Sequence, residues 1–198
     1  MARGVKPRGL DRRGRRRTIG PMRALLLILL PGLALAECPP VEPFPPAYDD
    51  LLEQVARAPD RATAQRLSGG LWTFWLDAPD ARAQALLDSG MAARAVGDFA
   101  TARDLLGQLV LYCPDYAEGW NQRAFAAFLR ADFEAALADL DRALELSPRH
   151  IAALSGKALT LIGMGRDAEG QQVLREALRL NPWLSERRLL TLPPEREL

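Results

Sequence analysis

The sequence predicts an all-α protein built from helical hairpins of equal length that stack side by side. From residue 83 onward, a pattern of residues repeats every 34 positions without a gap, through residues 83–116, 117–150 and 151–184. Proline recurs at the thirty-second position of each copy, as Pro114, Pro148 and Pro182. With 48% hydrophobic residues among 198, the composition is that of a folded domain of common size. Because one hairpin cannot bury its apolar face alone, we expect the copies to share one core.

Each recurring position has a packing explanation. Small residues at positions 8 and 20 let the two antiparallel helices of a hairpin approach closely, and large apolar residues fill the space around that contact. A residue pair such as Gly97-Asp98 suits the turn between the helices, and proline at position 32 ends the second helix. The contact residues are Gly90, Ala124 and Ala158 at position 8, Ala102, Ala136 and Gly170 at position 20, and Leu106, Leu140 and Leu174 at position 24.

Residues 83–184 resemble three tetratricopeptide repeats, and the middle copy, from Trp120 to Pro148, matches the pattern of that family best. The resemblance implies a right-handed α-solenoid of three helix hairpins and a role in binding other proteins. The sequence departs from the family at position 7, where Ser89, Arg123 and Lys157 replace the usual leucine.

The segments on either side of the repeats are expected to be helical caps. Residues 49–82 predict a divergent N-terminal helical pair, with Asp60 as the cap of its second helix. The aromatic cluster Trp72, Phe74 and Trp75 is interpreted in two ways, as a cover for the open end of the stack or as a binding patch. Residues 185–198 predict a C-terminal cap and tail.

The front of the chain predicts export. Residues 1–36 carry nine basic residues and one acidic residue, a net charge of +8, whereas residues 37–198 carry 17 basic and 24 acidic residues, a net charge of −7. The run from Met22 to Ala36 has a basic start, a short apolar core and a small-residue ending, which is typical of a signal peptide cut after Ala36. Residues 1–21 are then an extension, and Met22 is an alternative start. We expect a periplasmic protein without membrane insertion after cleavage, a retained anchor being the alternative.

Residues 37–48 are rich in proline and predict an extended segment. It is interpreted either as a spacer or as a strand of chain that packs along the helices. Cys38 in this segment and Cys113 at the end of a repeat are a candidate disulfide, with two free thiols as the alternative.

The residue inventory argues against catalysis, cofactors and nucleic-acid binding. One histidine and two cysteines are too few for a zinc or iron–sulfur site, so no metal, cofactor or catalytic residue is assigned. His150 is expected to be a solvated loop residue, and an acidic body does not favour nucleic acid. The carboxylates expected on solvated helix faces are Glu134, Asp139, Asp141 and Glu145.

The resemblance also places a partner-binding groove on the first helices of the repeats. The residues with which some family members hold a peptide's C-terminal carboxylate are absent, so we expect a mainly apolar groove for an apolar peptide or an amphipathic helix. Alternatively, some of its side chains pack against neighbouring helices, or the chain's own tail fills it. The expected groove residues are Leu87, Met91, Arg94, Asn121, Phe125, Phe128, Leu159 and Ile162.

The predicted function is that of a non-catalytic scaffold or adaptor for a protein or peptide partner in the cell envelope. The alternative is a subunit of an envelope assembly or secretion complex. An enzyme would need a nucleophile or a metal site, and the sequence supplies neither.

Overall fold

The computed structural model describes Met1 and residues 37–191 of the chain. The predicted signal peptide lies outside the described residues. Residues 37–191 form eight α-helices and one short 3-10 helix, without any strand, which confirms the all-α prediction. The helices are α1 Pro46–Ala56, α2 Arg61–Trp75, α3 Ala81–Ala95, α4 Phe99–Tyr112, α5 Ala117–Phe128, α6 Phe133–Leu146, α7 Ile151–Gly163, α8 Asp167–Leu180 and η1 Ser185–Leu189.

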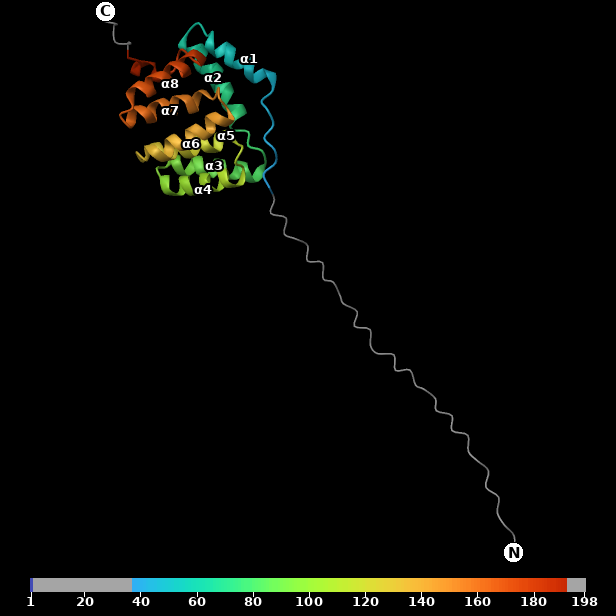
Figure 1. Cartoon of the computed structure of the whole chain (residues 1–198). Helices are drawn as coiled ribbons and strands as arrows, with labels where there is room; N and C mark the ends of the chain where they lie inside the picture. Colours follow the sequence, from blue (N-terminus) through green and yellow to red (C-terminus); the bar gives the residue numbers. More distant parts are fainter. Residues whose placement is uncertain (2–36, 192–198) are drawn as a thin grey trace, which may run out of the picture. The chain divides into compact units, whose positions relative to one another are not determined.

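Helices α3 to α8 form three antiparallel hairpins that stack in chain order (Figure 1). Each hairpin closes on the small residues of the repeat: a Cβ atom on Gly90 would lie 2.6 Å from Cγ of Leu106, which is closer than two carbons can pack. The turns place Gly97 and Gly165 at φ values of 82° and 75°, and Ala131 takes the same left-handed conformation at 57°. The close helix contact and the turn therefore explain why these positions recur every 34 residues.

Aspartate side chains cap the N-termini of three of the helices, α2, α3 and α4. The carboxylates of Asp60, Asp80 and Asp98 accept hydrogen bonds from the backbone N–H groups of the third residue along, at 2.7, 2.8 and 3.1 Å. Each satisfies a donor that the first turn of a helix leaves free. The cap predicted at Asp60 is confirmed.

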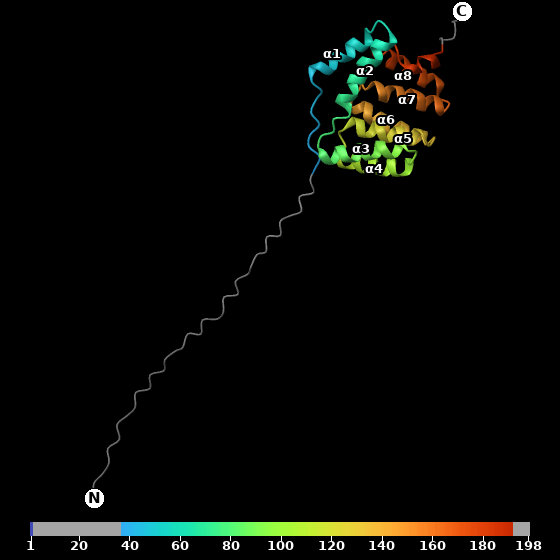
Figure 2. The same ribbon diagram turned by 180° about the vertical axis from the view of Figure 1, so that it is seen from behind.

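The N-terminal pair α1–α2 lies at the α8 end of the stack rather than beside the first repeat. Figures 1 and 2 show α1 close to α8, with α3 and α4 at the opposite end. Two hydrogen bonds join these segments: Asn181 Nδ2 donates to Ser68 Oγ at 3.1 Å, and Trp183 Nε1 donates to the Ala58 carbonyl at 2.9 Å. The N-terminal pair was expected to be a helical cap; it covers the end of the stack at α8 and not the end at α3.

The pair lies there because its apolar partners are there. Its buried residues form one cluster with Ile151 at the start of α7, and Leu180 and Leu184 pack against that cluster. The contributing residues from the pair are Tyr48, Leu52, Val55, Leu71 and Trp75.

The proline-rich residues 37–45, here called the strap, run from the first repeat to α1. A disulfide joins Cys38 to Cys113 at the end of α4, with the Cα atoms 5.1 Å apart. At the other end of the strap, the ring of Phe44 stacks on Tyr48 at 4.3 Å and meets the edge of Phe74 at 6.2 Å. The strap is therefore attached at both ends and is not a free spacer, but residues 39–45 between them stay exposed rather than packing along the helices.

None of the helices in the described part of the chain combines the length and the apolar character that crossing a bilayer requires.

Candidate functional site

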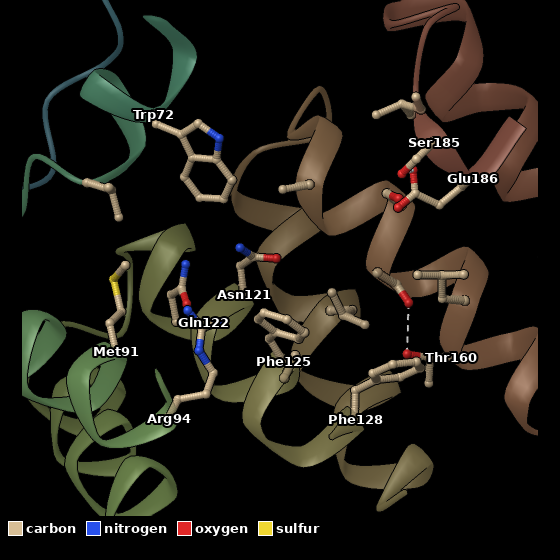
Figure 3. Close-up of a pocket in the computed structure, with 18 residues that line it drawn as sticks. Trp72, Met91, Arg94, Asn121, Gln122, Phe125, Phe128, Thr160, Ser185 and Glu186 are labelled. Carbon is tan, nitrogen blue, oxygen red and sulfur yellow. Dashed lines mark hydrogen bonds between the residues drawn. The ribbon is translucent and has the colours of Figure 1, made fainter. Parts of the chain in front are cut away.

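A cavity of about 590 Å³ opens on the side of the stack formed by the first helices of the repeats, α3, α5 and α7. The end of α2 bounds it through Trp72 and Leu76, and Leu184, Ser185 and Glu186 form another wall. Figure 3 shows Trp72 and Glu186 facing the cavity from different sides, with Phe125 and Phe128 between them. The groove of the repeats is thus partly enclosed by segments from both ends of the chain.

Six of the eight residues expected in the groove line this cavity: Met91, Arg94, Asn121, Phe125, Phe128 and Leu159. The other two do not. Leu87 is fully buried in a core cluster with Leu106, because its side of α3 faces α4. Ile162 packs inside the third hairpin, where its Cγ1 lies 2.7 Å from the position that a Cβ of Gly170 would take.

The wall made by α2 and by residues 184–186 was not expected from the sequence. Trp72 was part of the aromatic cluster with two interpretations, and the structure divides that cluster between them. Trp75 is 4% exposed and belongs to the core, whereas Trp72 is 37% exposed and lines the cavity. Residues 72 and 75 are neighbours on one face of α2, so helical spacing did not indicate which of the two rings would face the cavity.

The floor of the cavity is aromatic. Phe125 is 46% exposed, which is high for a large apolar side chain on the inner side of a stack. The guanidinium of Arg94 lies over its ring, 4.3 Å from the centroid, a favourable cation–π arrangement. Phe128 packs against Phe133 of α6, with the ring centroids 5.6 Å apart. Its ring therefore has an aromatic neighbour from the second helix of the hairpin.

Asn121 and Gln122 of the cavity wall belong to a buried polar cluster around Glu118. This carboxylate is 1% exposed and accepts hydrogen bonds from Asn121 Nδ2 at 3.0 Å, from His150 Nε2 at 2.8 Å and from Gln122 Nε2. Three donors on one buried carboxylate supply the pairing that burial of a charge requires. The cluster connects α5 to the start of α7.

His150 is fully buried, so the prediction of a solvated loop residue was wrong. It is the cap residue of α7, where Nδ1 accepts from the backbone N–H of Ala153 at 3.4 Å. Nδ1 therefore carries no hydrogen, and Nε2 donates to Glu118. The ring also stacks on Trp75 of α2 at 4.2 Å. The sequence hid this role because Glu118 and Trp75 are 32 and 75 residues away along the chain.

The prediction for Asp139 was also wrong. It was expected on a solvated face, but it is 7% exposed and holds Arg123 through two hydrogen bonds of 2.8 and 2.6 Å. In the next repeat, Lys157 pairs with Asp141 at 2.6 Å. Two of the three departures from leucine at position 7, Arg123 and Lys157, are therefore cations that pair with a carboxylate of α6.

Two polar atoms of the cavity wall are buried without a hydrogen-bond partner, Nη1 of Arg94 and Oε1 of Gln122. Burial lowers the pKa of Arg94, and the nearby charge of Glu118 opposes that shift. Arginine remains a cation in proteins, so the cavity contains a positive charge that lacks part of its usual hydrogen bonding. No group of three or more metal-ligating side chains gathers among the described residues.

Equal-length antiparallel helix hairpins that close on small residues and stack through a shared core define the tetratricopeptide repeat. Comparison with known proteins gives the same class: the sequence model of the family described as "Tetratricopeptide repeat" matches residues 117–150. Residues 117–150 thus match a tetratricopeptide repeat, and the three stacked hairpins have the fold of this class.

Relatives and solved structures carry the same description. A TPR repeat-containing protein of Rhizobium etli is 31% identical over 119 residues, which cover 60% of this chain and 58% of the relative. Human tetratricopeptide repeat protein 36 is 35% identical over 117 residues, which cover 57% of this chain and 62% of that protein. The chain thus spans about three fifths of the length of these curated relatives.

Among solved structures, the TPR domain of Arabidopsis OM64 matches with a TM-score of 0.54 and 18% identity, over 55% of this chain and 90% of that domain. The TPR2B domain of yeast Sti1, in a structure described as its complex with pHsp70, matches with a TM-score of 0.52 and 23% identity, over 56% and 91% of the two chains. These likenesses show the fold.

Proposed function

We propose that this protein is a non-catalytic scaffold of the bacterial cell envelope that binds an apolar peptide, or one face of a partner helix, in the cavity between α2, α3, α5 and α7. The observation that carries the proposal is the exposed Phe125 on the floor of a cavity of about 590 Å³. Exposed aromatic side chains in a concave site are typical of binding anchors.

The volume and the walls favour a short segment. Pockets of this size hold ligands no larger than a few residues, and Trp72 and Leu184 bound the space. A long helix laid along the whole groove would collide with α2. The first TPR domain of RPAP3, a structural neighbour, is described as bound to a short peptide, the HSP90 peptide SRMEEVD.

A non-catalytic role fits the environment of the histidine. His150 is enclosed by Trp75, Glu118 and the first turn of α7, so its ring cannot reach a substrate in the cavity.

Replacement of Phe125 by Ser tests the proposal. Residues 37–198, which follow the proposed cleavage site and are called the mature protein below, are used as bait in a periplasmic extract, and partners are identified by mass spectrometry. We expect Phe125→Ser to lose the partner that the wild type retains. Leu129→Ser is the matched control, since Leu129 is 43% exposed on the same stretch of chain but does not line the cavity. Equal recovery with both variants would disprove binding at the cavity.

Export to the periplasm is part of the proposal. The bridge between Cys38 and Cys113 supports it, because disulfides persist in oxidising compartments. The test is to express the full chain in a Gram-negative host, fractionate the cells and determine the N-terminus of the product. A periplasmic product that starts at Glu37 is the expected result, and an uncleaved cytoplasmic product would contradict it.

A further inference from the structure

The cavity contains an unpaired donor and an unpaired acceptor beside its aromatic floor. The donor is Nη1 of Arg94 on α3, and the acceptor is Oε1 of Gln122 on α5. Figure 3 shows the two side chains next to each other at the wall, with Met91 on one side and Phe125 on the other. The large majority of buried side-chain polar atoms have a hydrogen-bond partner in folded proteins, so this pair is suited to a ligand.

The orientation of the Gln122 amide is determined by its neighbour. Its Nε2 donates to Oε1 of Glu118, and a flipped amide would direct its oxygen at that carboxylate oxygen instead. Two acceptors in contact would repel each other, so Oε1 is the atom that stays unpaired. Gln122 is 2% exposed, which makes an unmet acceptor there costly.

A ligand that meets both atoms must carry an acceptor for Arg94 and an N–H group for Gln122. A carboxylate is the best acceptor for a guanidinium, because charge-assisted hydrogen bonds are the strongest. A fatty acid has a carboxylate and an apolar body but no N–H donor. A peptide has both, and one acidic residue brings its side-chain carboxylate and its backbone N–H within a few bonds of each other.

We propose that the cavity recognises an acidic residue inside an apolar peptide, with the side-chain carboxylate on Arg94, the backbone N–H on Oε1 of Gln122, and apolar neighbours on Met91 and Phe125. This inference rests on the proposed function, because it specifies which peptide the same cavity takes. The apolar wall flanks Arg94 on both sides, so the acidic residue lies within the segment rather than at its end. Glu186 on the opposite side of the cavity disfavours a second acidic residue there.

The test uses an array of heptapeptides acetylated at one end and amidated at the other, each with a central Glu flanked by Leu, Ile, Val, Met or Phe. Each peptide has a twin with central Gln. Fluorescence anisotropy with the mature protein gives the dissociation constants. We expect the best Glu peptides to bind at least about tenfold more tightly than their Gln twins, as for loss of one charge-assisted hydrogen bond.

Two changes, one in the protein and one in the peptide, test which groups cause the preference for Glu over Gln. Arg94→Gln should abolish the difference between Glu and Gln peptides, whereas Arg130→Gln, at an exposed arginine beyond the cavity, should leave it unchanged. Methylation of the backbone nitrogen of the central Glu should weaken binding about tenfold or more, whereas methylation of a terminal residue should not.

Four results would overturn the inference. They are no binding by any member of the array, a Glu preference that survives in Arg94→Gln, tighter binding of peptides with a free C-terminal carboxylate than of blocked ones, and Arg94-dependent binding of decanoate as tight as that of the peptides. None of these results bears on the Phe125→Ser capture experiment, so the proposed function stands or fails separately.

Discussion

The two ends of the repeat stack are protected in different ways. At the α3 end, the exposed residues of α3 itself are mostly small or polar, among them Arg82, Ala85, Asp88, Ser89 and Ala92, although the same hairpin also exposes Val96 and Leu111. At the α8 end, apolar side chains at Ile151, Leu180 and Leu184 are covered by α1 and α2. A solenoid end needs either a polar surface or a cover, and the N-terminal pair covers the end that lacks the polar surface.

The strap connects the two ends. It is bound at Cys113 of the first repeat by the disulfide and continues into α1 at the other end. The chain therefore closes on itself around the stack, and α2 reaches the cavity as a consequence. Four predictions test this difference. The α8 end is covered by α1 and α2 through specific contacts, whereas no described helix covers the α3 end.

The largest effect is expected at the polar cluster around Glu118, whose His150 stacks on Trp75 of α2. Glu118→Ala would leave the donors of Asn121, Gln122 and His150 without an acceptor, and we expect the free energy of unfolding to fall by about 3–5 kcal/mol. Urea unfolding followed by circular dichroism measures this. Glu118→Gln keeps the size and one acceptor oxygen and should cost less. If Glu118→Ala lowers the free energy of unfolding by less than about 1 kcal/mol, the cluster does not stabilise the contact between α5 and the start of α7.

Removal of the disulfide is expected to come next. The double variant Cys38→Ala and Cys113→Ala opens a link between residues 75 positions apart, and the unfolded chain gains entropy worth about 2–4 kcal/mol. Unfolding midpoints of the oxidised wild type and the variant give the difference. The reduced wild type should behave as the variant does, and a midpoint equal to that of the oxidised protein would contradict the prediction.

A smaller effect is expected at Trp183, whose Nε1 holds the Ala58 carbonyl between α1 and α2. Trp183→Phe removes that hydrogen bond and should cost about 1 kcal/mol. Amide hydrogen exchange should increase in α1. Trp120→Phe is the matched control, because it removes the bond to the Pro114 carbonyl within the stack. Faster exchange of α1 in both variants would show that the effect is not specific to the covered end.

The smallest effect is expected at the α3 end, in the dependence of the melting temperature on acidic pH. The hydrogen bond from the Ala83 N–H, and then that from the Tyr112 hydroxyl, lower the pKa of Asp80 below its ordinary value of 3.8. A lowered pKa contributes stability that is present above the ordinary value and is lost as the pH falls through the folded value. We expect the melting temperature of Asp80→Asn to fall less steeply than that of the wild type between about pH 5 and pH 3.

Asn is as good a helix cap as Asp, so the two proteins should melt alike near neutral pH. Asp80→Ala, which loses the cap, should melt lower at every pH. A steeper acid slope in Asp80→Asn would reverse the sign of the argument.

The repeat was predictable because its determinants are local and periodic. Gly90 and Leu106 lie within one hairpin, and a small residue and a leucine recur at the same two positions 34 residues later. Six of the expected groove residues line the cavity for the same reason, since helical spacing determines which side of α3, α5 or α7 a residue occupies. Leu87 and Ile162 were misplaced because each lies near the boundary between the groove side and the partner helix.

The polar cluster was not predictable by these means. Glu118, His150 and Trp75 have no counterparts in the other repeats, and each has an ordinary local explanation as a helix, loop or cap residue. Only their meeting in space turns a carboxylate and an imidazole into a buried pair, with an aromatic ring against the imidazole.

The helices, their pairing into hairpins and the order of the stack follow from the amino-acid sequence alone, because they depend on contacts between residues close along the chain. The position of the N-terminal pair, the extent to which it closes the groove and the identity of the unpaired polar atoms are known only from the folded structure. Those features depend on contacts across 75 to 125 residues, such as the disulfide and the bond from Trp183 to Ala58, for which no spacing rule exists.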